Sequence, residues 1–512
     1  MRRVVFLAFL VFLGLCSPAR AEDCGVRGND GGTDVVQLDC QDAATFATSP
    51  SPLKIRTPPT ATAPLGEIRG LTLVTPGDIG ASKFRVRIFD ASKTPSNIIK
   101  AIGVVSSGTS GMTPCEELQM IGYHPDPKFA LNKTTYQLGS DIDCSATNPA
   151  NTASINCSAA STTPGSLWKC GYAKRFNNKG VDGNPDVSGN PLNDDSIPAL
   201  EDLGDKGFKP LGCSIGASED SCTNPFTGRF DGKGYQIIGL TINRETNSVG
   251  LFGGTSGATI TGVGLVNESV SGVTNVGGLV GLVYNSSTIN NSYASGTVSG
   301  WQYYIGGLVG QLSNSTINNS YGKVTVTGPD IIGGLVGIVI NSSTINNSYA
   351  TGAATANTWD SGGLVGACVG NVTINNSYAT GTATGYAAVG GLVGLINASL
   401  SMNRSFAAGD VLAKIIPSPP NTAADYSGAL VGQLVMSTFN TTKVRWDKAK
   451  NLSSVVPCGV SSCASANVLA FTVSADAYDP TKEPLRSWDP NVWEFRKAEN
   501  KYPKLKNVGG TQ

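Results

Sequence analysis

Gly-Gly-Leu-Val-Gly occurs five times in this chain, and its copies begin at Gly277, Gly306, Gly333, Gly362 and Gly390. The intervals between the copies are 29, 27, 29 and 28 residues. A second motif, Ile-Asn-Asn-Ser-Tyr, begins at Ile289, Ile317, Ile345 and Ile374, and the altered copy Met402-Asn403-Arg404-Ser405-Phe406 follows it. A fixed period of this size is typical of structural units that stack on one another.

The composition of the repeated region favours strands over helices. Between Gly250 and Asp410 only six residues are charged, and Gly, Asn, Ser, Thr, Val and Ile dominate. An amphipathic helix needs more polar residues at a period of 3.6, whereas this composition suits short strands and tight turns. Weaker copies at Val249–Gly253 and Ser427–Gly432 extend the array. The sequence therefore predicts an all-β chain, with a parallel β-helix (solenoid) of about seven 28-residue coils.

Stacking at this period brings equivalent residues above one another, about 4.8 Å apart. We expect an internal aliphatic ladder of Ile289, Ile317, Ile345 and Ile374. The other two expected ladders are an aromatic stack and a column of paired amides. Their members are Tyr293, Tyr321, Tyr349, Tyr378 and Phe406 for the stack, and Asn290, Asn318, Asn346, Asn375 and Asn403 for the column. The repeated glycines are expected where the backbone has positive φ or approaches another backbone closely.

The N-terminus resembles a secretory signal peptide. Arg2 and Arg3 precede an apolar run from Val4 to Leu15, and Ala19-Arg20-Ala21 supplies the small residues of a cleavage site. Cys16 raises a lipoprotein alternative, but Leu15 stands where a small residue is expected. The predicted organisation is a signal peptide (1–21), a small N-terminal β domain (22–111), the first coils of the solenoid with disulfide-rich insertions (112–245), the repeat array (246–440) and a C-terminal cap (441–512).

The cysteines are interpreted from this export signal, because exported proteins meet an oxidising compartment. We expect five disulfides, three of which join Cys24 to Cys40, Cys213 to Cys222 and Cys458 to Cys463. The other two use Cys115, Cys144, Cys157 and Cys170, whose connectivity stays open, although Cys157 and Cys170 are placed to fasten one long loop. Cys368 is expected to be free and buried. Zinc is the weaker alternative, because the chain has a single histidine, His124.

Charge and motifs exclude several classes of function. Removing Arg2, Arg3 and Arg20 leaves 34 basic residues (37 − 3) against 37 acidic ones, a net charge near −3, so nucleic acid is not an expected partner. No apolar run in the mature chain is long enough to span a membrane. No zinc-protease motif, nucleophile elbow or cysteine–histidine pair stands out, so we expect no enzyme activity and no cofactor or metal. Asp141, Asp143 and Asp231 are more simply turn caps than calcium ligands.

The repeats resemble the GLUG repeat of bacterial exported proteins. The resemblance covers about residues 115–505, including Phe226–Tyr235 and Gly250–Gly253 before the array and Trp493–Phe495 and Lys501–Leu505 after it. It implies a parallel β-solenoid at the cell surface, often in adhesin-like proteins and sometimes in surface proteases. It brings no catalytic module and leaves residues 22–111 uncovered.

The segment between the Ile-Asn-Asn-Ser-Tyr motif and the next Gly-Gly-Leu-Val-Gly differs from coil to coil, and such variable loops often form the binding face of a solenoid. We therefore predict a ligand-binding edge for a surface glycan or protein, although the same aromatic residues are also suited to pack over a coil corner. Its members are Trp301, Tyr303, Tyr304, Trp359 and Tyr386. The predicted function is an exported bacterial cell-surface adhesin. The alternatives are a structural envelope or filament component and a carbohydrate-active enzyme, and the oligomeric state stays open.

Overall fold

The computed structural model describes residues 222–414 without a gap, and shorter segments on either side of that range. Before it, the described parts are backbone strands between residues 24 and 102, most of 113–123, 131–157 and 163–172, and parts of 175–213. After it, they are parts of 427–508. The predicted signal peptide, His124 and Cys463 lie outside the described residues.

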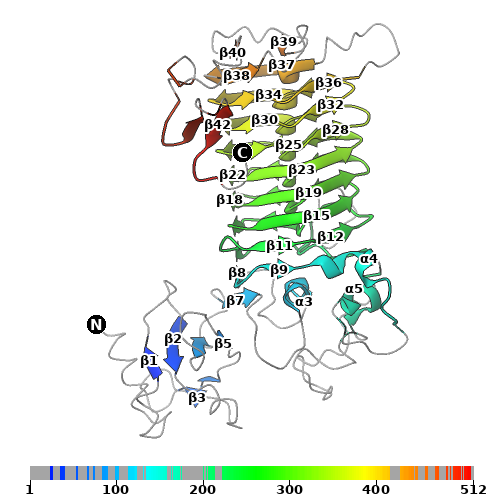
Figure 1. Ribbon diagram of the computed structural model, residues 1–512, viewed down its shortest axis with the longest axis vertical. Coiled ribbons are helices and arrows are strands. Elements are labelled where there is room, and N and C mark those ends of the chain that lie inside the picture. The colour runs from blue at the N-terminus through cyan, green and yellow to red at the C-terminus, as the bar shows by residue number, and fades with distance from the viewer. Residues whose placement is uncertain are drawn as a thin grey trace.

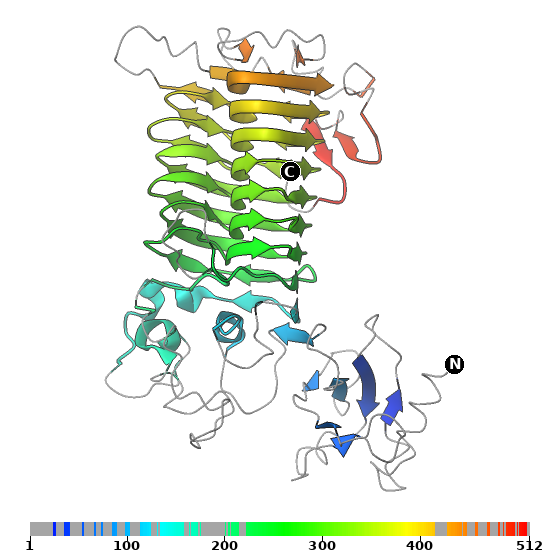
Figure 2. The same ribbon diagram turned by 180° about the vertical axis from the view of Figure 1, so that it is seen from behind.

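The central feature is a parallel β-solenoid of about seven turns with 28-residue repeats between residues 229 and 413, as the repeat period predicted. The coils lie one above another as an upright stack (Figures 1 and 2). Neighbouring coils pair in parallel, so that Gly277 lies beside Gly306 and Gly306 beside Gly333. The resemblance and the predicted fold are therefore both confirmed.

Each central coil contains four strands. The first strands are β16 (Val276–Gly277), β20 (Tyr303–Gly306), β24 (Asp330–Gly333), β29 (Ser361–Gly362) and β33 (Val389–Gly390). The second strands are β13 (Phe252–Ser256), β17 (Val280–Tyr284), β21 (Val309–Ser313) and β25 (Val336–Ile340). The third strands are β14 (Thr259–Thr261), β18 (Thr288–Asn290), β22 (Thr316–Asn318) and β26 (Ser343–Asn346). In higher coils these elements merge into β30 (Val365–Asn375), β34 (Val393–Asn403) and β37 (Ser427–Thr442).

The fourth strands form a separate sheet, which is the front layer in Figure 1. They are β11 (Gln236–Ile238), β12 (Thr241–Asn243), β15 (Gly264–Gly272), β19 (Tyr293–Gly300) and β23 (Tyr321–Gly328). Above β23 each is split in two: β27 (Tyr349–Ala350) with β28 (Ala354–Ala356), β31 (Tyr378–Ala379) with β32 (Ala383–Gly385), and β35 (Phe406–Ala407) with β36 (Val411–Ala413). Residues 236–243 are likewise divided into β11 and β12, because Gly239 has a φ of 71°.

Below the array the chain builds further parallel rungs. β7 (Ile98–Ile102), β8 (Thr134–Leu138) and β10 (Arg229–Asp231) stack under β14, and β9 (Ile142–Asp143) lies under β11. The helices are α3 (Pro114–Gln119), α4 (Pro149–Thr152) and α5 (Ser166–Cys170), with the 3₁₀ helix η2 (Ser145–Thr147). The long loop expected around Cys157 and Cys170 contains helices α4 and α5. The side chain of Asn148 caps α4, and the Cys157–Cys170 disulfide ends α5.

The N-terminal strands form an antiparallel sheet in the order β1 (Cys24–Val26), β2 (Val35–Cys40), β6 (Phe84–Phe89) and β5 (Leu73–Val74). A second pair joins β3 (Lys54–Ile55) to β4 (Gly66–Glu67). After the array come β38 (Val444–Asp447), β39 (Val456–Cys458), β40 (Val468–Phe471) and the antiparallel hairpin of β41 (Trp493–Arg496) and β42 (Lys501–Leu505). Among the described residues, no helix is long and apolar enough to cross a membrane.

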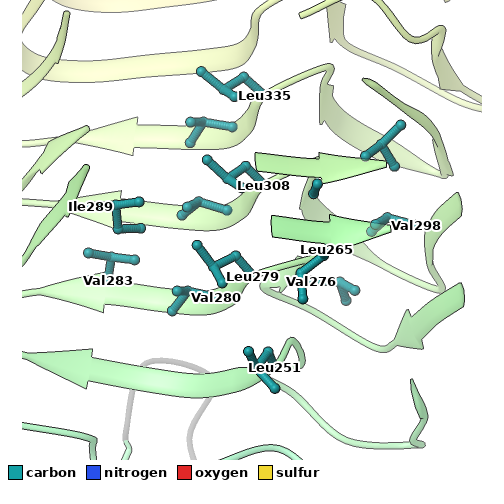
Figure 3. Close-up of a cluster of buried hydrophobic side chains, with 14 of the residues drawn as sticks. Leu251, Leu265, Val276, Leu279, Val280, Val283, Ile289, Val298, Leu308 and Leu335 are labelled. Carbon is teal, nitrogen blue, oxygen red and sulfur yellow. The ribbon is translucent and has the colours of Figure 1, made fainter. Parts of the chain in front are cut away.

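The interior is filled by aliphatic columns in register. Ile289, Ile317, Ile345 and Ile374 pair in that order and are fully buried, as predicted. Figure 3 shows a second column in which Leu279, Leu308 and Leu335 lie one above the next. Burying one such side chain stabilises the fold by about 1.5–3 kcal/mol, and every coil repeats the gain.

The aromatic stack runs up the outer face of the fourth strands. Successive ring centroids from Tyr293 to Phe406 are 4.7, 4.7, 5.0 and 4.8 Å apart, with nearly parallel planes. The β41–β42 hairpin covers its upper part: the ring centroid of Trp493 lies 6.1 Å from that of Tyr378 and 5.9 Å from that of Phe406. The stack was expected, but this cover was not, although it explains why the C-terminal segment is rich in tryptophan.

Polar ladders support the turns after the third strands. The Nδ2 of each asparagine in the predicted amide column donates to the Oδ1 of the one before it, at 2.8–2.9 Å. The second asparagine of each motif has a φ near 46–49°, a left-handed conformation that asparagine tolerates well. Ser292 and its equivalents are buried and accept a backbone N–H from the previous coil. The repeated Asn-Ser triplets are therefore used in stacking.

The repeated glycines serve close approach rather than positive φ. A β-carbon at Gly334 would overlap the carbonyl oxygen of Gly363, and one at Gly362 would overlap that of Val365. None of the glycines in the five Gly-Gly-Leu-Val-Gly motifs has a positive φ. Of the two roles expected for these glycines, close backbone approach is therefore the one found. Adjacent coils, and the two sides of each turn, meet backbone to backbone there.

One carboxyl group breaks the apolar pattern of the interior. Glu268 lies in β15, after the left-handed residue Asn267, and its side chain points toward Gly278. It is 2% exposed, and neither carboxyl oxygen has a hydrogen-bond partner in the part of the chain that the structure describes. Burial raises the pKa of Glu268 well above its ordinary value. The interior therefore favours the neutral acid.

Candidate ligand-binding edge

The turns that follow the fourth strands are joined into one continuous edge. The N–H of Trp301 donates to the carbonyl of Gly272, and that of Asp330 donates to the carbonyl of Gln302. Higher up, the N–H of Trp359 donates to the carbonyl of Pro329, and that of Tyr386 donates to the carbonyl of Trp359. Because each bond joins one coil to the next, the variable segments lie one above another. The structure therefore brings the predicted residues to the same edge.

The two tryptophans of this edge are among the four exposed large apolar side chains of the described residues, with Tyr235 and Leu412. Trp301 is 49% exposed and Trp359 is 54% exposed. Elsewhere in the array most large aliphatic side chains fill the interior columns, with Leu412 as an exposed exception. Both tryptophans therefore present a large apolar ring surface to solvent at this edge.

The tyrosines of the edge are half-buried. The rings of Tyr303 and Tyr304 meet edge to face with centroids 4.8 Å apart. The Nζ of Lys414 lies 5.2 Å from the ring centroid of Tyr386, a cation–π arrangement. These three side chains therefore pack partly against their own coils, as the alternative interpretation of the sequence expected. They are less exposed than Trp301 and Trp359.

The backbone of this edge is strained at equivalent positions of two coils. Tyr304 has a φ of 66° and Ile331 has a φ of 54°, and these residues follow the paired positions Tyr303 and Asp330. A β-branched residue in the left-handed region is a genuine outlier. Such conformations cost of order 1–3 kcal/mol and are concentrated at functional sites.

Two carboxyl groups support this turn from beneath. The Oδ1 of Asp330 accepts the N–H groups of Ile331 at 2.8 Å and Asp360 at 3.1 Å, and the Oδ1 of Asp360 accepts the N–H of Ala388 at 3.1 Å. Burial raises the pKa of Asp330, and hydrogen bonds from the backbone oppose the rise. Burial, followed by repulsion from Asp330, raises the pKa of Asp360 to about 6. This ladder is not evident in the sequence, because two aspartates 30 residues apart become neighbours only through stacking.

The cysteines lie away from this edge. Disulfides join Cys115 to Cys144, Cys157 to Cys170 and Cys213 to Cys222, and Cys368 is a buried free thiol. The Cys115–Cys144 bond ties helix α3 to the residue that follows β9. The sequence left this pairing open, because these two elements become neighbours only in the folded chain. Cys458 is also in a disulfide, with a partner outside the described residues. Cys24 lies opposite Cys40 in the β1–β2 register, and their side chains lie outside the described residues.

Of the acidic residues considered as calcium ligands, Asp143 and Asp231 cap turns, and Asp141 bonds to strand β11 of the next rung. The Oδ1 of Asp143 accepts the N–H of Ser145, that of Asp141 accepts the N–H of Gln236, and that of Asp231 accepts the N–H of Lys233. Among the described residues, no group of three or more His, Cys, Asp or Glu side chains is arranged to hold a metal ion.

Comparison with known proteins gives three findings. Residues 272–299 match the GLUG motif. The sequence is 38% identical to halomucin from Haloquadratum walsbyi over 109 residues. The match covers 20% of this chain and 1% of halomucin. The crystal structure of a protein from Bacteroides ovatus that was proposed to be an immunoglobulin A1 protease is similar with a TM-score of 0.38 and 18% identity. That similarity covers 73% of this chain and 85% of the other.

Proposed function

Because the chain is a β-solenoid that carries the GLUG motif, we propose that it is an extracellular binding protein that adheres through the edge of Trp301 and Trp359. The three disulfides support an extracellular location, since such bonds persist in oxidising compartments. The observation that carries the proposal is the exposure of both tryptophans on one edge of a stack that buries its other repeated apolar side chains. The proposed partner is a surface glycan or a surface protein.

Tryptophan and tyrosine suit this role. They offer a large rigid contact area with few rotatable bonds, and they are enriched among the residues that dominate binding energy. The rigid coils below hold them at fixed spacing, so little ordering is needed when a ligand binds. The strained turn at Tyr304 and Ile331 is consistent with an edge shaped for contact.

A carbohydrate-active enzyme is the alternative that one observation favours. Asp330 and Asp360 lie in neighbouring coils beside the tryptophans, and the pKa of Asp360 is raised to about 6. However, Oδ1 of each carboxyl group accepts backbone N–H groups of the turn, which is the arrangement of a cap. We therefore propose binding without catalysis. Release of reducing sugar from a polysaccharide, lost in Asp360→Asn, would favour the enzyme instead.

The test compares beads coated with the full chain, applied to surfaces carrying mucin, collagen or cellulose. The Trp301→Ala, Trp359→Ala double variant should lose most of the adhesion that the parent shows, because the exposed ring faces are removed. Tyr235→Ala is the matched control, since Tyr235 is 38% exposed on a different turn of the solenoid. Equal adhesion of the parent and the double variant, at equal folded content, would exclude this edge.

A further inference from the structure

A regular array of hydroxyl groups lies beside the tryptophan edge, on the outer face of the fourth strands. Two columns run up this face, and successive members of each pair in register; the second column ends where Thr384 pairs with Leu412. The first column is Thr241, Ser269, Thr297 and Thr325. The second is Asn243, Ser271, Ser299, Thr327, Thr355 and Thr384. We call these two columns the hydroxyl face.

The hydroxyl face points outward, and apart from the bond that the Ser271 hydroxyl donates to Asn243 Oδ1 at its lower end, it is largely unused by the described part of the chain. Thr297 and Thr325 are exposed, whereas Val298 and Val326 beside them are buried. In the central coils, the hydroxyls of Thr297, Thr325, Thr327, Thr355 and Thr384 make no hydrogen bond with other described residues. The asparagine ladder differs, because its amides bond to one another from coil to coil. The hydroxyl face is therefore a repeated set of donors and acceptors available to a ligand.

The hydroxyl face and the tryptophan edge are continuous. Ser299 lies two residues before Trp301, Thr327 lies two residues before Pro329, and Thr384 lies two residues before Tyr386. The fourth-strand sheet in Figure 1 ends in these turns. A ligand that covered both surfaces would meet hydroxyl groups along one side and aromatic rings along the other.

From this arrangement, and resting on the proposed function, we propose that the ligand is a neutral, unbranched polysaccharide. It lies parallel to the solenoid axis, with about one sugar per coil. Its hydroxyl groups exchange hydrogen bonds with the hydroxyl face, and its apolar ring faces pack against Trp301 and Trp359. Successive sugars of an unbranched chain lie about as far apart as successive coils, which rise by roughly 4.8 Å, so sugars of the same orientation meet equivalent groups.

Charge and periodicity distinguish this ligand from others. The two columns contain no charged side chain, and Lys323 is the neighbouring cation on β23. Asp330 and Asp360 lie at the adjoining turns and Lys414 lies over Tyr386, so the two surfaces have no excess of positive charge that would favour an acidic sugar. A protein ligand has no identical group at every coil, and it would gain nothing from the register of the columns. A branched glycan would match only one or two coils.

The experiment measures binding of neutral oligosaccharides by titration calorimetry. The probes are di-, tetra- and hexasaccharides of cellulose, xylan, mannan and chitin, with a galacturonic acid hexamer as the acidic comparison. For at least one neutral series, affinity should rise from the dimer to the hexamer, because each added sugar engages another coil. The acidic hexamer should bind more weakly than that neutral hexamer.

The hydroxyl face is tested by the triple variant Thr297→Val, Thr325→Val, Thr327→Val. Valine keeps the shape and the strand preference of threonine, so the fold should stay intact, and hexamer affinity should fall about tenfold as hydrogen bonds are lost. The matched control changes Thr288, Thr316 and Thr344 to Val on the third strands. Affinity independent of length, or a triple variant that binds like the parent, would overturn the proposal. If adhesion still depends on Trp301 and Trp359 in that case, the proposed function survives and only the linear polysaccharide is wrong.

Discussion

The interior ladders and the tryptophan edge belong to the same coils but differ in how they vary. At the interior positions each coil repeats the last, as with Ile289, Ile317 and Ile345, which pair directly and are fully buried. At the edge the position of Trp301 is held by Pro329 in the next coil and by Asn357 in the coil above, and Trp359 follows two residues later. The same residue type is needed at equivalent positions of successive coils where the side chains stack on one another. It is not needed where the side chain faces solvent. The difference therefore separates residues that stack coils from residues open to other roles.

The largest expected effect is at the ladder. Ile345→Ala should lower the free energy of unfolding by about 2–5 kcal/mol, because it leaves a cavity between two neighbouring coils that cannot collapse. Urea unfolding followed by circular dichroism measures the change. A loss below about 1 kcal/mol would show that the interior is loosely packed and that the ladder does not hold the coils together.

The second prediction concerns the one carboxyl group inside the stack. Because folding raises the pKa of Glu268, the folded protein holds this proton more tightly than the unfolded chain does. Stability is therefore lost as the pH rises from the ordinary glutamate range toward the raised value. Glu268→Gln should remove that loss, so melting temperatures of parent and variant should diverge as the pH rises from 5 to 9. Parallel curves would show that the carboxyl group is hydrated or paired in solution.

A smaller effect is expected at the asparagine ladder. Asn346→Ala removes the amide that donates to Asn318 and accepts from Asn375, and it should cost about 1 kcal/mol because the neighbouring amides can still reach water. Asn347→Gly is the matched comparison. Beyond the loss of the Asn347 side-chain hydrogen bond, this change should lower the free energy of unfolding by only a few tenths of a kcal/mol. Glycine adopts the left-handed φ of 48° readily. If both variants lost a large and equal amount of unfolding free energy, the turn conformation would depend on the amide hydrogen bonds themselves.

Much of the fold was predictable from the sequence, because the fold is a repetition. Once coils stack, spacing alone places Ile317 on Ile289 and Tyr321 on Tyr293, and both pairs are found. The outward side of the tyrosine stack and its cover by Trp493 were not predictable, since they depend on where a non-repeating segment returns along the stack. Helices α4 and α5 were missed because short capped turns leave little periodicity to detect.

The sequence predicted which aromatic residues lie at the edge, but it did not predict how deeply each one is buried. Variation between coils singled out Trp301 and Trp359, and stacking brings them to one edge. The half-burial of Tyr303, Tyr304 and Tyr386 depends on local packing that spacing does not encode. The aspartate ladder was missed because a lone aspartate in a turn is common, and only three-dimensional contact joins Asp330 to Asp360.

The most direct test of this account measures stability and adhesion together in the Trp301→Ala, Trp359→Ala double variant. Both side chains are about half exposed, so the free energy of unfolding should fall by less than about 2 kcal/mol, a smaller loss than the top of the range expected for Ile345→Ala. Adhesion of beads coated with the folded variant should be largely lost. A variant that unfolds as readily as Ile345→Ala, or that is fully folded and adheres like the parent, would contradict the division of roles between ladder and edge.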